Sequence, residues 1–426
     1  MLSVSMSMEE YIMTLGIVVS FVGMLATMVL SRKWIKEILM NAGLSRRVLL
    51  GAVVIVIVFL GIEIALVKPT QQLFFDDSIY QGMALSLLHT GQAWFCDYGT
   101  PFNCIAGEIF HEPIGESFNL AMGFALGGVS IMTTYNTQIA LTAVAVLMTF
   151  FVSLLVFKNR TAALFSELFM AVSPMMLIWA APTTSDMPAL TYTLVALFAV
   201  LVFMHRKNAS TFGFALFALA LATYMRVNSL LLLPVFLIVY LLLDDKGIAD
   251  SIKANIRLVK QNLLNTKVLV LLLLFLLLLA PEIGYTFSQL NTGYGYSGTF
   301  VQLTCSPSLP AIHPNAAISL QNFNANICAN LNFWLNYYKT GYIIQPLIYT
   351  LVAIFGGFAM IFKGKARELA AIGIWFIAFF LLYTAFYAGG VNYGVDWRFM
   401  LSVIAQASML AGFGAASICE LGNRFQ

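Results

Sequence analysis

The sequence has little charge for its length. Asp, Glu, Lys and Arg make up only 10% of its 426 residues, against about 25% in ordinary soluble domains. Hydrophobic residues make up 60% and the mean hydropathy is +0.88, so polar side chains are too few to cover a water-soluble body of this size. These values exclude a soluble enzyme, a disordered chain and a fibrous repeat. They predict an all-α polytopic membrane protein.

An excess of either sign of charge is also missing. The 22 Lys and Arg against 19 Asp and Glu leave a net charge of +3, and no basic tail or patch is interleaved with aromatic residues. We therefore expect no nucleic-acid partner, and the membrane is the first partner that the composition predicts.

Long apolar runs are what the sequence has instead. A membrane-spanning helix needs about 20 mostly apolar residues, and eleven runs meet or approach that length. Two of them, 211–225 and 228–243, are short enough to be tilted or re-entrant. The eleven candidate spans are 11–30, 48–67, 136–157, 162–181, 188–204, 211–225, 228–243, 267–284, 342–362, 369–388 and 398–418.

The Lys and Arg residues are unevenly divided between the loops. Cytoplasmic loops retain these residues during membrane insertion, so their positions predict the orientation. With the N-terminus outside and the C-terminus in the cytoplasm, the basic residues left outside are Lys68, Arg226, Lys339 and Arg398. The lack of a retention signal in residues 422–426 favours a prokaryotic plasma membrane.

Two of the predicted exterior connections are long, and most of the non-membrane mass therefore faces outward. Any chemistry is expected on that side. We expect four segments along the chain: an additional N-terminal span with a basic inner loop (1–47), a transmembrane core that includes the first exterior loop, 68–135 (48–284), the second exterior loop (285–341), and the C-terminal transmembrane helices (342–426).

The five cysteines follow the same topology. Cys96 and Cys104 lie in the first exterior loop, Cys305 and Cys328 lie in the second, and Cys419 lies on the inner side. Paired cysteines in an oxidising compartment favour disulfides, so we expect one in each exterior loop. Free thiols are the alternative.

An acidic pair, Asp76-Asp77, stands where the chain leaves the second span and enters a predicted helix over 77–90. One interpretation is that Asp77 caps this helix and stabilises its positive end. The other is chemical, because adjacent carboxylates raise one another's proton affinity and suit a general base or a metal ligand.

A second polar cluster, residues 108–116, follows in the same loop and precedes a predicted interfacial helix over 117–130. It contains His111 and Glu112. His111 is either a loop histidine with ordinary hydrogen bonds or a contact to a phosphate or an acceptor.

A tight exterior turn, 182–188, contains Ser185 and Asp186 before the next predicted span. Either residue can act as a helix cap, and a carboxylate there can also contact a substrate or a metal.

Two of the exterior cations are arginines at the ends of predicted spans. Arg226 lies between the two short spans and Arg398 begins the last one. Each side chain can snorkel to the headgroup layer. Arginine is also the residue best shaped to hold a phosphate, so two of them beside an acidic loop suggest a bound lipid phosphate.

The order of these features resembles that of GT-C superfamily glycosyltransferases, such as protein O-mannosyltransferases and aminoarabinose transferases of lipid A. The resemblance runs from about 70 to 245, with weaker support to 418. Many relatives have Lys or His directly before the proline of the loop element, whereas here Glu112 stands there and His111 is one place earlier. The features that carry the resemblance are Asp76-Asp77, Thr90-Gly91, Phe110-His111-Glu112-Pro113-Ile114-Gly115, Asp186 and Arg226.

The resemblance implies a hexosyl- or pentosyltransferase that uses a polyprenyl (dolichyl or undecaprenyl) phosphate-linked sugar donor. The acceptor hydroxyl of a lipid, glycan or protein would attack the anomeric carbon in one inverting displacement. Asp76 is the expected base, with Asp77 as its partner or substitute. The expected substrate-binding residues are His111, Glu112, Asp186, Arg226 and Arg398.

A cofactor is left open. Asp76, Asp77 and Asp186 offer the oxygen ligands that Mg²⁺ or Mn²⁺ prefers, although the resemblance implies that several relatives need no metal.

A polytopic transporter or lipid flippase is the alternative function. Transporters place ionisable groups near the middle of the membrane and often contain paired repeats. Here Glu63, Glu167 and Glu282 are the acidic residues within predicted spans, and most of the polar groups gather in exterior loops instead.

Overall fold

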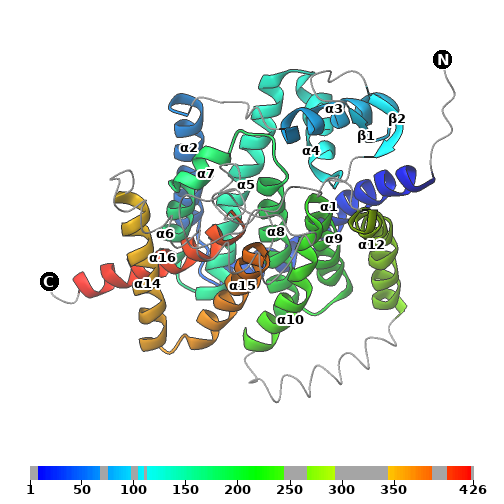
Figure 1. Ribbon diagram of the computed structural model, residues 1–426. Coiled ribbons are helices and arrows are strands. Elements are labelled where there is room, and N and C mark those ends of the chain that lie inside the picture. The colour runs from blue at the N-terminus through cyan, green and yellow to red at the C-terminus, as the bar shows by residue number, and fades with distance from the viewer. Residues whose placement is uncertain are drawn as a thin grey trace.

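The computed structural model describes residues 8–67, 75–96, 104–109, 113–243, 266–292, 344–385 and 401–423. The side chains of Asp76, Cys96 and Cys104 lie outside this description although their backbone is included. The described chain is almost entirely helical, which confirms the predicted all-α class (Figure 1). Its elements are α1 (Met8–Asn41), α2 (Arg46–Ala65), α3 (Phe75–Thr90), β1 (Trp94–Cys96), β2 (Cys104–Ile109), α4 (Gly115–Gly127), α5 (Ile131–Phe157), α6 (Arg160–Ala171), α7 (Pro174–Trp179), α8 (Asp186–His205), α9 (Ala209–Met225), the 3₁₀ helix η1 (Val227–Leu231), α10 (Leu232–Leu243), α12 (Thr266–Thr292), α14 (Ile344–Phe362), α15 (Ala366–Ala385) and α16 (Leu401–Gly422).

Several helices have the length and composition of membrane spans, and the chain is a multi-pass integral membrane protein. Within the described residues, six helices are long and apolar enough to cross a bilayer. Three shorter apolar helices, Ala209–Met225, Val227–Leu243 and Leu347–Phe362, coincide with predicted spans. The first two are the runs expected to be short; Arg226 lies between them, and the second begins with η1.

Two predicted boundaries were wrong. The predicted span 162–181 is two helices, α6 and α7, because Pro174 has no N–H to donate and holds Ser173 in an extended conformation (ψ 126°). The first span does not end at residue 30. Its helix, α1, continues through the basic stretch to Asn41, and Gly43 follows with a φ of +100°.

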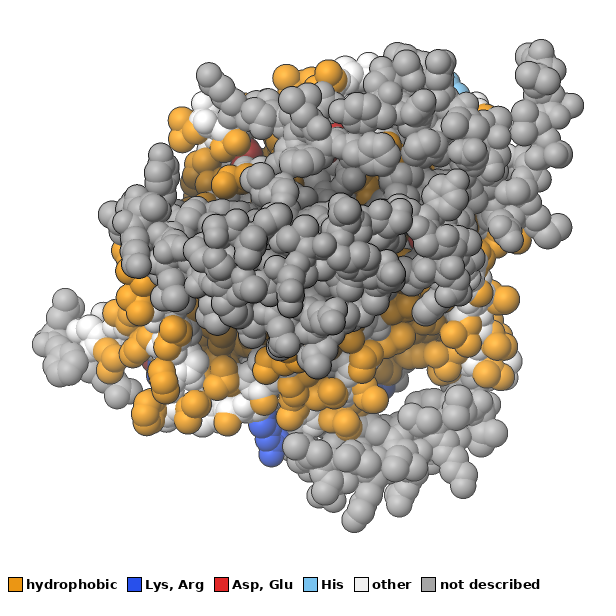
Figure 2. Space-filling model, viewed as in Figure 1, with side chains coloured by type: hydrophobic (Ala, Val, Ile, Leu, Met, Phe, Trp, Pro, Cys, Tyr) orange, Lys and Arg blue, Asp and Glu red, His pale blue; other side chains and the backbone are white. Residues whose placement is uncertain are grey.

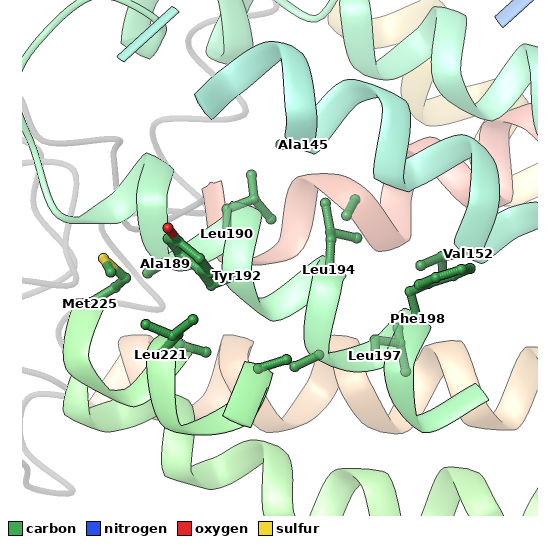
Figure 3. Close-up of a cluster of buried hydrophobic side chains, with 14 of the residues drawn as sticks. Ala145, Val152, Ala189, Leu190, Tyr192, Leu194, Leu197, Phe198, Leu221 and Met225 are labelled. Carbon is green, nitrogen blue, oxygen red and sulfur yellow. The ribbon is translucent and has the colours of Figure 1, made fainter. Parts of the chain in front are cut away.

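Helix α8 lies at the centre of the bundle and packs against α5 on one side and α9 on the other. Figure 3 shows its apolar side chains between these two helices, with Tyr192 and Met225 at the same end of the cluster. Farther along the chain, α16 packs closely on α14 because Gly356 and Gly414 bring the two backbones together. Small residues commonly allow such close approach between membrane helices.

The two ends of the bundle differ in charge. Helices α3 and α4 and the strand pair lie together at one end, at the top of Figure 1. We call it the acidic end, because the first turns of α3, α4 and α8 carry Asp77, Glu116 and Asp186 there.

The opposite end is the basic end. In Figure 2, blue side chains are visible at the lower edge, below a broad area of orange hydrophobic side chains. Among the described residues, Arg226 is the single Lys or Arg at the acidic end. The other described Lys and Arg residues lie near helix termini on the basic side of the bundle: Arg32, Lys33, Lys36, Arg46, Arg47, Lys158, Arg160, Arg206, Lys207, Lys267, Lys363, Lys365 and Arg367.

The loop predicted to be the first exterior one, 68–135, contains the elements that the sequence predicts and one that it does not. The predicted helices 77–90 and 117–130 correspond to α3 and α4. Gly91 ends α3 with a φ of +75°, a conformation that favours glycine. Between them, β1 and β2 pair antiparallel with Trp94 opposite Ile109 and Cys96 opposite Cys104.

The strand register sharpens one of the disulfide predictions. Because Cys96 and Cys104 are directly opposed in the backbone ladder, we expect peptide mapping without reductant to find them linked to each other. Recovery of both as alkylated free thiols from native protein would contradict the prediction. Cys305 and Cys328 lie outside the described residues, and Cys419 is an exposed free thiol.

Candidate functional site

Three helix N-termini and one helix C-terminus meet at the acidic end. Asp77 lies in the first turn of α3, Glu116 in the first turn of α4, and Asp186 is the first residue of α8. The partial positive charge of a helix N-terminus stabilises a carboxylate in its first turn. Helix α9 ends beside them at Met225, and Arg226 follows in an extended conformation (φ −152°, ψ 125°).

Close packing fixes how α4 meets the end of α9. A Cβ placed on Gly115 would lie 2.4 Å from the carbonyl oxygen of Tyr224. Only a residue without a side chain allows the first turn of α4 to approach that backbone. The contact therefore places Glu116 beside the segment that ends in Arg226.

Arg226 is held by two consecutive residues of the α8 N-terminus. Its Nη1 lies 3.0 Å from Oδ1 of Asp186, and its Nε donates a hydrogen bond of 3.1 Å to Oγ of Ser185. The side chains of Arg226 and Asp186 are 15% and 4% exposed. Ser185 precedes α8 but makes no side-chain capping bond, so its hydroxyl orients the guanidinium instead.

A small cavity of about 20 Å³ adjoins this ion pair. A cavity of that size holds about one water molecule. It joins the α8–α9 region to α15 and α16, and its lining residues are Asp186, Ala189, Leu190, Thr193, Arg226, Asn228, Ser229, Phe379 and Ser402.

A buried polar network lies behind the ion pair and links four helices. Glu116 accepts hydrogen bonds from Nε2 of Gln138 and, at 3.5 Å, from Nδ2 of Asn119. The hydroxyl of Tyr192 donates to Oδ1 of Asn119 at 3.1 Å, and Nδ2 of Asn119 lies 3.2 Å from Sδ of Met225. The network ties α4 to α5, α8 and α9, and it fixes the residue that immediately precedes Arg226.

Comparison with known proteins identifies this architecture. A family model described as dolichyl-phosphate-mannose-protein mannosyltransferase matches residues 111–285, less than half of the chain. Among solved structures, ArnT from Cupriavidus metallidurans matches both in the apo state and bound to undecaprenyl phosphate, each with a TM-score of 0.51 and 15% sequence identity. The fold is that of the GT-C superfamily.

The match to ArnT covers most of this chain but not most of ArnT. Each alignment covers 85% of this chain, and 59% or 60% of the ArnT chain in the apo or the undecaprenyl-phosphate-bound structure. This chain therefore spans about three fifths of the length of the GT-C structure that it resembles. No curated protein matches the chain.

The predicted site residues of this GT-C fold fall into two groups. Asp77, Asp186 and Arg226 lie at the acidic end, and Asp77 is only 2% exposed. The side chains of Asp76, His111, Glu112 and Arg398 lie outside the described residues.

The structure describes two of the three side chains predicted to bind a metal ion, those of Asp77 and Asp186. The described residues contain no group of three or more His, Cys, Asp or Glu side chains that could hold a metal ion. Asp76, the third member of the predicted set, has its side chain outside that description. The Mg²⁺ or Mn²⁺ site stays a prediction, and the chemistry below uses no metal.

Glu116 belongs to the predicted polar cluster 108–116, but no sequence pattern assigned it a role, and the structure makes it a functional candidate. Burial raises its pKa well above that of an ordinary glutamate and the neighbouring Asp77 raises it further, whereas hydrogen bonds from Asn119 and Gln138 lower it. The net direction is upward, so the Glu116 carboxyl holds its proton more tightly than an ordinary glutamate does. Its network partners Asn119, Gln138 and Tyr192 are themselves buried.

Glu116→Gln tests the direction of this pKa shift. Glutamine imitates the neutral carboxyl, so we expect the free energy of unfolding at pH 4, below the ordinary glutamate pKa, to change by no more than about 0.5 kcal/mol. The raised pKa stabilises the fold below the ordinary glutamate pKa, and this contribution is lost as the pH rises toward the folded-state pKa. Thermal melting from pH 4 to pH 8 should therefore favour the variant increasingly at higher pH. A difference independent of pH would contradict a raised pKa, and Glu116→Ala should be less stable throughout because it removes the network.

Proposed function

We propose that this chain is a glycosyltransferase that moves a sugar from a polyprenyl-phosphate-linked donor to an acceptor hydroxyl at the acidic end of the molecule. The observation that carries the proposal is the Arg226 guanidinium, held by Asp186 and Ser185 beside buried carboxyl groups at one end of a membrane bundle. The matching family model is named for a dolichyl-phosphate-mannose substrate. One of the similar structures contains undecaprenyl phosphate.

The proposed reaction is one inverting displacement. The acceptor oxygen bonds to the anomeric carbon while the bond from that carbon to the phosphate oxygen breaks. The acceptor's proton passes to the carboxylate of Asp76, and the leaving phosphate gains negative charge. A positioned base and fixed positive groups are the two devices that lower the barrier of such a step.

Arg226 suits the leaving phosphate because its orientation is set before the donor binds. Two of its nitrogens contact Asp186 and Ser185, and a guanidinium has five N–H donors in a planar fork. The ion pair holds the fork in place, so the donor does not have to order a flexible side chain.

Arg398 is the proposed second contact to the phosphate. Ser402 lines the same cavity as Arg226, and it follows Arg398 by four residues. Four residues span at most about 14 Å, which leaves Arg398 within reach of that cavity. His111 and Glu112 are proposed to contact donor or acceptor from the loop that precedes α4.

We further propose that the acidic end faces away from the cytoplasm. The opposite end carries nearly all the described Lys and Arg, as the insertion rule requires of a cytoplasmic side. A prokaryotic plasma membrane, a hexosyl or pentosyl donor, and a lipid, glycan or protein acceptor complete the proposal.

Release of the lipid carrier distinguishes this function from transport. Purified protein is incubated with dolichyl- or undecaprenyl-phosphate sugars and candidate acceptors, and the free polyprenyl phosphate is measured by mass spectrometry. A transferase releases carrier phosphate in step with glycosylated acceptor. A flippase moves the intact donor between the leaflets of a proteoliposome and releases none, and that result would replace the proposal with the transporter alternative.

A further inference from the structure

A second cavity lies at the basic end, far from the ion pair of Arg226. Three helices end around it: α1, α5 and α8. Its volume is about 240 Å³, and its lining residues are Trp34, Glu37, Ile38, Asn41, Ala42, Leu155, Lys158, His205 and Arg206. The transfer reaction proposed above uses none of these residues.

Two cations line this cavity: Lys158, which follows α5, and Arg206, which follows α8. The guanidinium carbon of Arg206 lies 3.9 Å from the centroid of the Trp34 ring, and Nζ of Lys33 lies 5.6 Å from the same centroid. Stacking on an aromatic face orients a guanidinium without neutralising it. Within the described part of the chain, neither Lys158 nor Arg206 forms an ion pair. Their charges are therefore left to a ligand or to water.

Lys158 occupies an unusual backbone position. It caps the C-terminus of α5 with φ 51° and ψ 34°, and its N–H bonds the carbonyl of Leu154. It is the only non-glycine residue with positive φ among those described. Glycine meets this backbone requirement without strain, so what lysine adds at this position is its ammonium group. Backbone strain of this kind is often found at ligand sites.

The cavity also has negative groups. Glu37 lines it from α1, and the carbonyl end of each helix that ends there carries about half a negative charge. These negative groups would repel a simple anion such as free phosphate. A zwitterion, with a phosphate for Lys158 and Arg206 and an amine for Glu37, matches both signs.

An exposed apolar track on α1, formed by Met28, Val29 and Leu30, precedes the residues that line the cavity. Leu30 lies one turn before Trp34 on the same helix face and is 70% exposed. Trp and Lys side chains at such a position are typical of the membrane–water interface. The combination of a charged cavity and an exposed apolar track fits a lipid better than a soluble ion.

From these observations we propose that the cavity at the basic end binds a phospholipid with a primary-amine head group. Lys158 and Arg206 hold its phosphate, Glu37 holds its ammonium group, and an acyl chain runs along Leu30. Because the site is separate from the proposed catalytic cluster, the proposal does not depend on glycosyl transfer.

Native mass spectrometry of the full chain, with phosphatidylethanolamine, phosphatidylglycerol and phosphatidylcholine added in turn, tests it. Phosphatidylethanolamine should bind best. Lys158→Gly and Arg206→Gln should each weaken its binding about tenfold, the size expected for one charge-assisted hydrogen bond. Lys365→Ala is the matched control, because Lys365 lies at the same end but pairs with Glu368 at 2.9 Å, and its lipid binding should be unchanged.

Two further measurements separate this site from a structural role and from a free-ion site. Lys158→Gly relieves the backbone strain, so its melting temperature should hold or rise while lipid binding falls. Glu37→Gln should remove the preference for phosphatidylethanolamine over phosphatidylglycerol. Unchanged lipid binding in the Lys158 and Arg206 variants, or displacement of the lipid by millimolar inorganic phosphate, would overturn the proposal.

Discussion

Asp76→Asn is expected to lower the rate of sugar transfer by about 10²- to 10⁴-fold, the usual contribution of a general base. Asparagine keeps the size and most of the hydrogen-bonding capacity of aspartate, but its amide is not basic enough to take the proton from the acceptor hydroxyl. Binding of the lipid-linked donor should change little, because the base acts on the acceptor. The measurement is single-turnover transfer by purified protein, together with donor binding at equilibrium.

Asp77→Asn is the matched control for this experiment. Asp77 is adjacent in sequence, but its side chain is buried and interacts with Glu116. We expect a smaller loss of transfer than for Asp76→Asn, accompanied by altered stability. Full activity of Asp76→Asn would remove the base assignment. If Asp77→Asn alone abolished transfer while the protein stayed folded, the role would move to Asp77.

Arg226→Ala is expected to lower kcat/KM for the lipid-linked donor by about 10- to 100-fold. That range corresponds to the loss of one charge-assisted contact, worth about 1.5–3 kcal/mol. Arg226→Lys should recover only part of it, since an ammonium group does not reproduce a planar fork that contacts Asp186, Ser185 and a phosphate together. Steady-state kinetics with varied donor and saturating acceptor give the comparison.

Removal of Arg226 also leaves the carboxylate of Asp186 without its ion pair in a buried place. Breaking such a pair can cost about 3–5 kcal/mol of stability, so lost activity alone is ambiguous. The double variant Arg226→Gln with Asp186→Asn keeps a neutral hydrogen-bonding pair and should recover stability without recovering donor use. Donor kinetics that stay unchanged in Arg226→Ala would count against the phosphate contact.

Much of the fold follows from the sequence because a membrane limits the alternatives. Apolar runs of bilayer length and the division of Lys and Arg between loops are one-dimensional signals, and they predicted the helical class. The break at Pro174 and the continuation of α1 to Asn41 were missed for local reasons. Hydropathy alone marks neither a proline inside an apolar run nor a helix that extends beyond the membrane.

The candidate site was less accessible to sequence reasoning. Asp186 and Arg226 were each singled out, but nothing in their spacing of 40 residues indicates that they form an ion pair. That pairing arises because α8 and α9 are antiparallel neighbours, so the start of one lies beside the end of the other. The contacts of Asn119 with Tyr192 and of Gln138 with Glu116 were invisible for the same reason, since the two partners of each contact lie on different helices.

A structure of the protein with a bound polyprenyl-phosphate-linked sugar, determined by cryo-electron microscopy in a lipid nanodisc, is the most direct measurement. The account predicts the donor phosphate within about 3 Å of the Arg226 guanidinium, with the Asp76 carboxylate on the side from which an acceptor reaches the anomeric carbon. A donor phosphate bound elsewhere, or an Asp76 side chain on the opposite flank of the bundle from Arg226, would contradict it.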